Sequence, residues 1–261
     1  MFYSNCGWSN FFGKHHYYMD NYRSRIYKYY NTTWHESELP RSLADFKSRA
    51  PTMRHIIKRF FPKDKSASIL DLGCGHGTLL YFAQRSGYLN IVGVDISNQQ
   101  VALANHIGIS GVFQGDLVET LKATPSNSLD TVIAFDVIEH FNKCELLTLV
   151  DAVYAALRPG GTWVIHAPNA NSPFVGTVRY GDFTHEQAFT PNSISQLLKA
   201  SGFRKVTNCE CSPNIHGIFS LIRYFLWKFF RAFLVVFDAS EAGWHRGKGV
   251  WTRNFYSVAV K

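Results

Sequence analysis

The sequence contains too few cysteines to hold a fold together with disulfide bonds. Its 261 residues include five cysteines, an odd number, and only Cys209 and Cys211 stand close together. This distribution excludes a disulfide framework and a structural zinc site, and it favours a reducing cytosol. The N-terminus also lacks the basic, apolar and small-residue order of a secretion signal. We therefore expect a cytoplasmic protein.

No internal repeat or low-complexity segment interrupts the chain, whose length suits one large domain with additions. The net charge of +8 is unevenly distributed. Residues 1–67 hold twelve basic and five acidic side chains, residues 68–212 hold eight and twelve, and residues 213–253 hold six and two. Basic flanks suit nucleic acid or an anionic membrane. The sequence carries no RNA-binding signature, so we expect no nucleic-acid partner.

Three alternate glycines after a short apolar run form the most informative stretch of the sequence. Residues 69–72 are typical of a buried parallel strand, and Gly73, Gly75 and Gly77 let the chain turn tightly into a helix and leave room beside it. Peptide N–H groups at the start of that helix favour negative groups of a ligand, and Asp71 adds an acceptor for a positive one. The alternative is a glycine turn without a ligand.

From residue 69 onward the sequence alternates between strand and helix patterns, which is typical of a parallel sheet with helices on both faces. The predicted strands are 69–72, 90–95, 111–114, 129–135, 161–166, 203–209 and 252–260. The predicted helices are 76–86, 98–106, 143–157 and 191–202, and the last starts after Thr190 because threonine is a good cap and Pro191 suits the first turn. Residues 212–251 form an insertion before the last strand.

The run Asp71-x-Gly73-x-Gly75-x-Gly77 resembles the first motif of class I S-adenosylmethionine (SAM)-dependent methyltransferases. The dinucleotide fingerprint Gly-x-Gly-x-x-Gly is not met. Three later segments are similar to further motifs of that family and occur in the same order: the acid that ends the second strand, residues 114–117, and residues 135–141 with 157–161. The resemblance covers about residues 68–211 and the last strand.

This resemblance implies a Rossmann-like α/β fold with a seven-stranded sheet in the order 3-2-1-4-5-7-6, in which the last strand is antiparallel. It also implies SAM as cofactor and S-adenosylhomocysteine (SAH) as product. The acid after strand two would hold both ribose hydroxyls, and the end of strand three would contact the adenine ring. The cofactor-binding residues expected on this basis are Asp71, Gly73, Gly75, Gly77, Asp95, Ile96, Asp116, Leu117 and Asp136.

Two histidines are candidates for the base that a hydroxyl acceptor needs. SAM is already activated by its sulfonium charge, so the enzyme mainly aligns the acceptor and excludes water. His185 is the first candidate, because histidine titrates near neutrality and Asp182, three residues earlier, is placed to orient it. His140, which follows the fourth strand, is the second. The alternative for His185 is a loop histidine that holds backbone polar groups.

Within the family, the chain is most similar to small-molecule O-methyltransferases, including those of bacterial surface-polysaccharide pathways. These often carry Asp-Pro-x-His after strand five, whereas phenylalanine takes the proline position between Asp182 and His185 here. Glu139 is either a carboxylate of the site or the cap of the next helix. Asp136, His140, Asp182 and His185 carry metal-binding atoms, but no compact ligand motif relates them, so we predict no metal.

The expected methyltransferase domain, residues 68–261, is preceded by an N-terminal segment and contains an insertion, and each of these has its own composition. Residues 1–67 are rich in tyrosine and basic side chains, and we expect a helical cap with its best-formed helix at 41–61. Residues 217–237 are strongly apolar, but burying Arg223, Lys228 and Arg231 in a bilayer would cost about 8–10 kcal/mol. These charges fall on one side of a helix, which favours the interface of an anionic membrane. Packing on the protein or a homodimer contact is the alternative.

We therefore expect a SAM-dependent O-methyltransferase that acts on a hydroxyl of a sugar or of a glycolipid or polysaccharide precursor. Its location would be cytoplasmic, with peripheral association at the inner face of the membrane. Three alternatives stay open: a methyltransferase of a quinone or other lipid-like small molecule, a nicotinamide-dependent oxidoreductase, and a SAM-binding adaptor without activity.

Overall fold

The computed structural model describes residues 23, 25–27, 39–243 and 249–261, and Ser42–Lys261 form one compact unit. Most of the predicted N-terminal cap therefore lies outside the described residues. Its last part does not form a separate layer, because Phe46, Ile56 and Ile57 are buried in the same hydrophobic cluster as β1 (Ile69–Leu72). All four cysteines among the described residues are free, as the sequence predicts.

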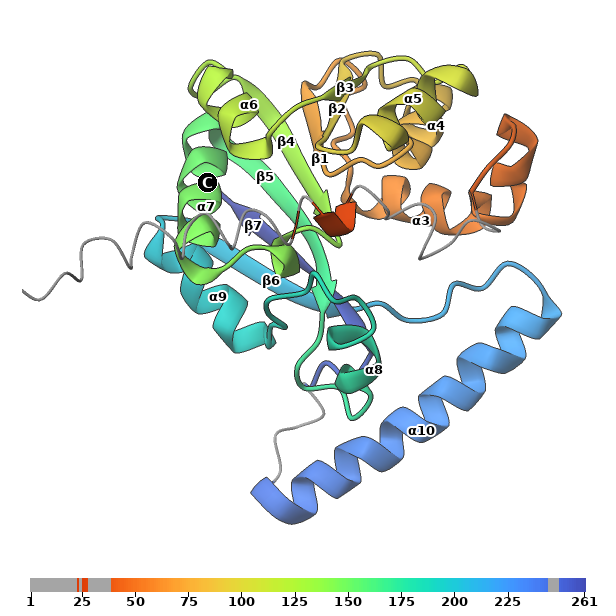
Figure 1. Ribbon diagram of the computed structural model, residues 1–261. Helices are drawn as coiled ribbons and strands as arrows, with labels where there is room; N and C mark the ends of the chain where they lie inside the picture. Colours follow the sequence, from red (N-terminus) through yellow and green to blue (C-terminus); the bar gives the residue numbers. More distant parts are fainter. Residues whose placement is uncertain (1–22, 24, 28–38, 244–248) are drawn as a thin grey trace, which may run out of the picture. The chain divides into compact units, whose positions relative to one another are not determined.

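A seven-stranded sheet forms the centre of this unit (Figure 1). Its order is β3-β2-β1-β4-β5-β7-β6, and β7 runs antiparallel to both of its neighbours. Both features of the predicted topology are confirmed. After β1, the strands are β2 (Ile91–Asp95), β3 (Val112–Gln114), β4 (Leu129–Phe135), β5 (Leu157–Pro168), β6 (Lys205–Glu210) and β7 (Asn254–Val260).

The strands form a sheet buried on both faces because apolar side chains point to each side in turn. In the central pair, Leu70 lies opposite Val132, and both belong to one core cluster. Their neighbours Ile69 and Ile133 belong to the cluster on the other face. Trp163 of β5 is fully buried in the first cluster. The ends of these buried strands therefore carry the polar residues that can reach solvent or a ligand.

Helices cover both faces of the sheet. The first cluster includes side chains of α6 (Leu117–Ala123), α7 (Lys143–Ala156) and α9 (Pro191–Ala200). The second includes side chains of α3 (Ala50–Phe60), α4 (Thr78–Arg85) and α5 (Asn98–His106). Figure 1 shows these two groups on opposite sides of the strands. The remaining elements are η2 (Leu43–Ser48), η3 (Ile138–His140), α8 (Val175–Arg179) and α10 (Ile218–Ala242).

Several elements differ from the sequence prediction, and three of them bear on the site or on the sheet. The helix expected at 41–61 is split into η2 and α3, because Pro51 starts a new helix in its first turn. Helix α6 was not predicted, although Asp116 caps it by accepting hydrogen bonds from the N–H groups of Val118 and Glu119, each at 2.9 Å. Strand β5 begins at Leu157, before the predicted Gly161, and a register shift in its pairing with β4 accommodates the extra residues.

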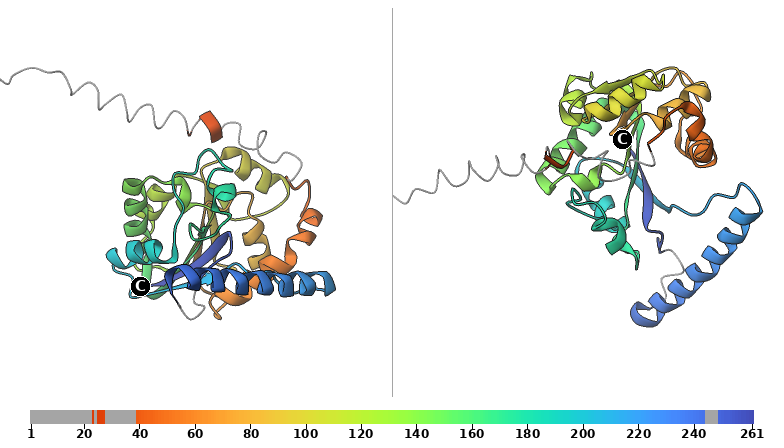
Figure 2. Two further views of the ribbon diagram at one scale, coloured as in Figure 1. Left: turned by 90° about the horizontal axis from the view of Figure 1, so that it is seen from below. Right: turned by 45° about the vertical axis from the view of Figure 1, so that its right-hand side comes forward.

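The predicted insertion contains one long helix, α10, of 25 residues. The right-hand view of Figure 2 shows it extending away from the sheet and its covering helices. Arg231 ties it to the sheet, because its Nε donates to both carboxylate oxygens of Glu210 in β6, at 2.8 and 3.0 Å. Among the described residues, no helix combines the length and the apolar character needed to cross a membrane.

Candidate active site

The glycine run after β1 forms a left-handed turn that leads into α4. Gly73, Gly75 and Gly77 have φ angles of 65°, 55° and 76°, which side chains other than glycine rarely adopt. A Cβ atom on Gly73 would lie 2.5 Å from Cγ2 of Val137, so the turn after β1 presses against the turn after β4. A Cβ atom on Gly75 would meet only the side chain of Gln100, at 3.7 Å. The backbone is therefore tightly packed at Gly73 and open at Gly75.

Asp95 fixes the geometry of this turn from the end of β2. Its Oδ2 accepts a hydrogen bond from the N–H of Gly75 at 2.8 Å, and its Oδ1 accepts one from the N–H of Ser97 at 2.8 Å. Each carboxylate oxygen keeps a second lone pair. The carboxylate of Asp95 thus links the end of β2 to the glycine turn. This is the position expected of a residue that holds ribose hydroxyls beside that turn.

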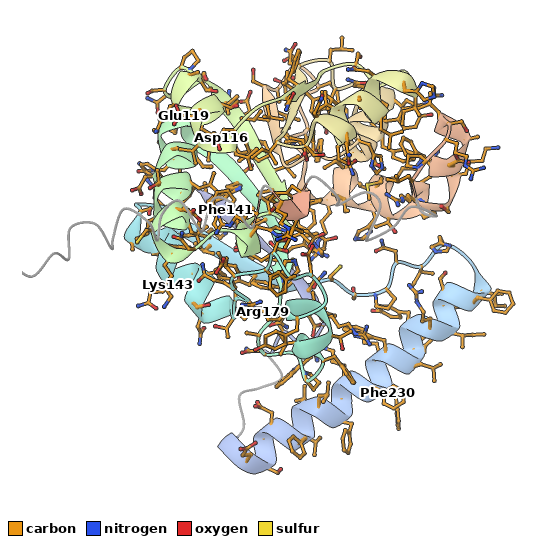
Figure 3. The ribbon with its side chains drawn as sticks, viewed as in Figure 1. Asp116, Glu119, Phe141, Lys143, Arg179 and Phe230 are labelled. Carbon is orange, nitrogen blue, oxygen red and sulfur yellow. The ribbon has the colours of Figure 1, made fainter. Side chains whose placement is uncertain are left out.

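The third group of expected cofactor residues lies at the ends of β2 and β3. Ile96 is 54% exposed, directly after Asp95. Asp116 follows β3 and caps α6 with Oδ1, next to the exposed Glu119 (Figure 3). Leu117 begins that helix and packs partly against the core. Because β1, β2 and β3 are parallel neighbours, these residues share one edge of the sheet with the glycine turn.

Asp71 differs from the other expected cofactor residues because it is buried within β1. Desolvation and the nearby carboxylate of Asp95 raise the pKa of Asp71 to about 8. Its carboxyl group is therefore largely protonated at neutral pH in the ligand-free protein. A positively charged ligand group beside it would favour the ionised form.

Asp136 stands directly after β4 in a left-handed conformation, with φ of 55°. Such a conformation costs on the order of 1–2 kcal/mol for a residue with a Cβ atom. Nδ1 of His166, in β5, lies 2.9 Å from Oδ1 of Asp136. Desolvation opposes ionisation of Asp136, yet the charge and hydrogen bond of His166 lower the pKa of its carboxyl group. The left-handed backbone thus places the carboxylate of Asp136, paired with His166, at the edge of the sheet where the expected cofactor residues lie.

A chain of hydrogen bonds holds His140, the second candidate base. Nδ1 of His140 lies 2.9 Å from Oγ1 of Thr184, and that hydroxyl donates to Oδ1 of Asp182 at 2.6 Å. Thr184 therefore accepts from His140, so the lone pair of a neutral His140 ring is at Nε2. Burial and the nearby His185 lower the pKa of His140 to about 4, so the ring is neutral at physiological pH.

His185 is held by the backbone of helix α8. Its Nδ1 donates to the carbonyl oxygen of Val178 at 3.0 Å, so the lone pair of its neutral ring is also at Nε2. Asp182, which we expected to orient His185, instead acts on His140 through Thr184. The guanidinium group of Arg179, labelled in Figure 3, donates to the carbonyl oxygens of His185 and Glu186 and fixes the loop.

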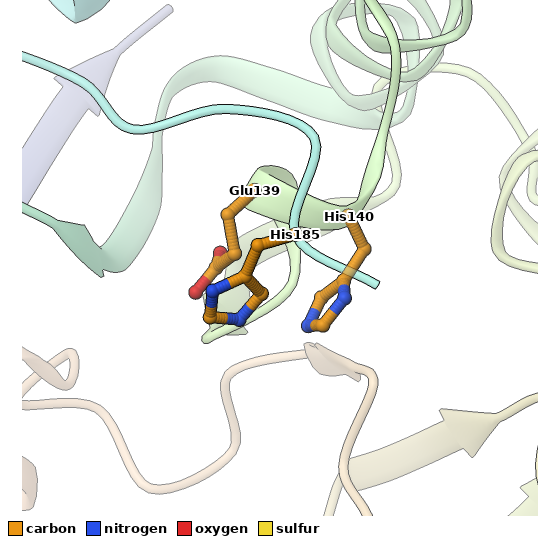
Figure 4. Close-up of side chains that lie close together, drawn as sticks. All are labelled: Glu139, His140 and His185. Carbon is orange, nitrogen blue, oxygen red and sulfur yellow. The ribbon is translucent and has the colours of Figure 1, made fainter. Parts of the chain in front are cut away.

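The two candidate histidines lie together, with a ring separation of 4.7 Å and an interplanar angle of 66°. Glu139 joins them, and the structure gives it a role that the sequence left open. It does not cap α7, because Asn142 does so, with Glu145 completing the capping box. Its carboxyl group is fully buried and makes no hydrogen bond. Figure 4 shows it beside the rings of His140 and His185.

The family model for the methyltransferase domain matches residues 46–208, which is more than half of the chain. Phosphoethanolamine N-methyltransferase 1 of Arabidopsis thaliana is 26% identical over 144 residues, which are 53% of this chain and 29% of that protein. A sterol 24-C-methyltransferase of Neurospora crassa is 29% identical over 109 residues, which are 39% of this chain and 28% of that protein. The match thus spans less than a third of either relative.

The fold is also that of solved methyltransferases. A SAM-dependent methyltransferase from Archaeoglobus fulgidus superimposes with a TM-score of 0.60 and 22% identity, over 84% of this chain and 98% of that one. At this identity the likeness concerns the fold. The ordered sheet, the glycine turn joined to Asp95 and the match to the family model agree with one another. The chain therefore belongs to the methyltransferase-domain family.

Proposed function

We propose that this protein transfers the methyl group of SAM to a hydroxyl of a glycolipid or another lipid-linked acceptor at a membrane surface. SAM binds at the edge formed by the glycine turn, Asp95 and the end of β3, and leaves as SAH. The histidine pair then faces the acceptor. A hydroxyl acceptor must lose its proton, and the two imidazole rings supply groups that can assist this loss.

The observation that carries the membrane part of this proposal is the outward face of α10. Eleven large apolar side chains of this helix are between 37% and 86% exposed: Ile218, Phe219, Leu221, Ile222, Phe225, Leu226, Phe229, Phe230, Phe233, Val236 and Phe237. Figure 3 shows Phe230 pointing away from the rest of the protein. At about 100° per residue, these positions occupy roughly half of the helix circumference. A face of this size marks an interaction surface.

The polar side of α10 faces the protein. In a helix that packs on a core, the apolar side faces the protein instead. Ser220 is buried, and Arg231 is paired with Glu210. The side chain of Arg231 therefore binds within the protein, whereas the sequence predicts that Arg223, Lys228 and Arg231 all contact lipid headgroups. Arg223 and Lys228 are exposed at the edges of the apolar face, where long cationic side chains reach headgroups while apolar ones enter the acyl boundary.

Methyl transfer is tested with SAM that carries a deuterated methyl group. The full-length protein is incubated with this SAM and with either the lipid fraction or the water-soluble fraction of a cell extract. We expect a deuterated O-methyl product in the lipid fraction, identified by mass spectrometry. Label on the amine of phosphoethanolamine would replace the proposed acceptor by that of the Arabidopsis relative.

The role of the histidine pair is tested in the same assay. We expect His185→Ala to lower turnover by about 10²–10⁴-fold while SAH binding stays unchanged. His106→Ala, at an exposed position of α5, is the matched control and should behave like the wild type. Wild-type turnover in His185→Ala would remove His185 from the chemistry.

Membrane association is tested by sedimentation with vesicles. We expect the full-length protein to sediment with vesicles of anionic phospholipid, less so as salt rises. Combined Phe225→Ser, Phe229→Ser and Phe233→Ser substitutions should abolish binding. Leu89→Ser with Leu147→Ser, exposed apolar positions elsewhere, is the control. Wild-type protein that stays in the supernatant at low salt would overturn the proposal and favour a homodimer contact.

A soluble sugar or a polysaccharide precursor is the second candidate acceptor, on the basis of the Asp182-to-His185 segment and its similarity to polysaccharide-pathway enzymes. In the extract experiment this candidate predicts label in the water-soluble fraction. A quinone would give label in the lipid fraction on an aromatic oxygen, and a SAM-binding adaptor would give no labelled product in either fraction.

A further inference from the structure

We propose that Glu139, His140 and His185 bind a divalent metal ion, and that this ion holds the acceptor hydroxyl during methyl transfer. One ligand atom from each residue lies within 4.8 Å of the others (Figure 4). The role of the ion rests on the function proposed above, whereas the binding of the ion does not. These ligands form no compact motif in the sequence, because two of them are adjacent in η3 and the third lies in the loop after α8.

The carboxyl group of Glu139 is the first reason for a cation at this place. Its side chain has no exposed surface, and neither carboxylate oxygen has a hydrogen-bond partner. A buried carboxylate without partners is costly, since it loses its hydration and gains nothing in return. A bound cation removes this cost, because carboxylate oxygen is a good ligand for divalent ions.

The orientation of the two imidazole rings is the second reason. In His140, Nδ1 donates to Thr184, and in His185, Nδ1 donates to the carbonyl oxygen of Val178. Each ring therefore offers its Nε2 lone pair. Metal-binding histidines almost always donate their other ring N–H in this manner, to a carboxylate, a carbonyl or water. Asp182 extends the arrangement behind His140, because it accepts from Thr184.

The backbone holds the three ligands in place before any ion binds. The carbonyl oxygen of Glu139 accepts hydrogen bonds from the N–H groups of Glu186 and Gln187, at 2.8 and 3.1 Å. These bonds tie η3 directly to the residues that follow His185. Arg179 fixes the same loop through the carbonyl oxygens of His185 and Glu186. Binding therefore requires side-chain adjustment, with no rearrangement of the fold.

The ligand set indicates which ions suit the site. Ligands of one tetrahedral ion at about 2.0–2.2 Å lie about 3.3–3.6 Å apart, so the side chains must close by up to about 1.5 Å. Two imidazoles and one carboxylate suit zinc, manganese, iron or cobalt in the divalent state better than magnesium or calcium. Three protein ligands also leave coordination positions open for an acceptor oxygen.

An ion at this place changes how the hydroxyl is activated. The acceptor oxygen binds to the ion, which lowers the pKa of the hydroxyl, and its proton passes to water. The oxygen then forms a bond to the methyl carbon of SAM. The bond between that carbon and sulfur breaks, and its electron pair stays on sulfur, which gives neutral SAH. The histidines thus act as ligands, and neither of them takes the proton.

Cobalt(II) is a suitable probe, since it reports its ligands in its visible spectrum. The full-length protein is first freed of metal with a chelator and then titrated with cobalt(II), with zinc(II) in competition. We expect one ion per chain and a saturable visible spectrum. Glu139→Gln, which keeps the shape of the side chain, and His185→Ala should each weaken binding at least tenfold. His106→Ala should bind like the wild type, and SAH binding verifies the fold of every variant.

Two results would overturn the proposal. The first is the absence of stoichiometric binding at millimolar cobalt(II) in a protein that binds SAH. The second is equal binding by wild type and Glu139→Gln. Methyl transfer at full rate after metal removal would leave the histidines as the base and exclude the ion from the reaction. An ion that binds as expected in a protein that methylates no hydroxyl would retain the site and reject the proposed function.

Discussion

Among single residues, the buried carboxyl group of Asp71 links stability to pH. Folding raises its pKa from an ordinary value near 4 to about 8, so between these values the folded state binds more protons than the unfolded state. Its contribution to stability is therefore complete below about pH 4 and is lost as pH rises towards 8. We expect this residue alone to lower the free energy of unfolding by at most about 1.4 kcal/mol per pH unit in the ligand-free protein.

The measurement is urea unfolding at several pH values between 5 and 8, with wild type and Asp71→Asn compared at each. The asparagine variant should gain stability relative to the wild type as pH rises. Asp151→Asn, at an exposed position of α7, should run parallel to the wild type throughout. A constant difference between Asp71→Asn and the wild type would show that Asp71 does not titrate in this range.

Asp95 should contribute directly to the affinity for SAM. In the proposed binding mode the two ribose hydroxyls donate to the carboxylate of Asp95, and Asp95→Ala removes both hydrogen bonds, each contributing on the order of 1.5–3 kcal/mol. It also releases the N–H groups of Gly75 and Ser97. We expect the dissociation constant of SAH, measured by titration calorimetry, to rise at least tenfold. Asp151→Ala is the control, and an unchanged constant in folded Asp95→Ala would mean that the ribose binds elsewhere.

The residues of the site were predictable from sequence to different degrees. Asp95 and the glycines follow strands of a parallel sheet, so chain order alone places them at one edge. The partners of His185 were not predictable in this way. The carboxylate expected to orient it, Asp182, contacts His140 through Thr184, because the loop after α8 turns back upon η3. Sequence spacing carries no information on such a contact.

Among the elements, α10 is joined to the sheet by the ion pair of Arg231 and Glu210. The side chains of Arg231 and Glu210 are 22% and 15% exposed, and Glu210 also accepts from the N–H of Trp251. Arg231→Ala would leave the half-buried carboxylate of Glu210 without its cation. We expect a loss of about 1–3 kcal/mol in the free energy of unfolding, measured in urea.

Arg223→Ala provides the matched control, because it removes the same charge from an exposed position of the same helix. We expect it to change stability by less than about 0.5 kcal/mol. Equal losses in both variants would mean that the pair with Glu210 does not anchor α10. Arg231→Met should lose less stability than Arg231→Ala, because methionine restores packing but not the charge.

Some elements have the bounds that the sequence predicts. Strands β1 and β4 and helix α5 have the predicted bounds. Helix α6 is not predicted from the sequence because it has only seven residues. Its clearest signal is the cap at Asp116, and that residue is interpreted as one that binds the cofactor. The glycines at 160 and 161 suggested a turn, whereas the structure accommodates them in β5 through a shift of register.

For the whole molecule, the outward face of α10 predicts association in the absence of a membrane. Half of this helix exposes apolar side chains to water, which favours burial against a second copy of the chain. We expect sedimentation velocity to detect species larger than a monomer, which detergent micelles dissociate. The Phe225→Ser, Phe229→Ser and Phe233→Ser variant should remain monomeric without detergent. A wild type that sediments as a monomer at every concentration would contradict this expectation.

The position of β7 determines the order in which the molecule can be completed during synthesis. This strand lies between β5 and β6 and pairs with both, yet it follows α10 in the chain. While the ribosome is still translating the residues after α10, β6 has no neighbour in the sheet to pair with. The apolar helix is therefore exposed to chaperones and to membranes before the sheet closes. A chaperone or a membrane therefore meets α10 before β7 has completed the sheet.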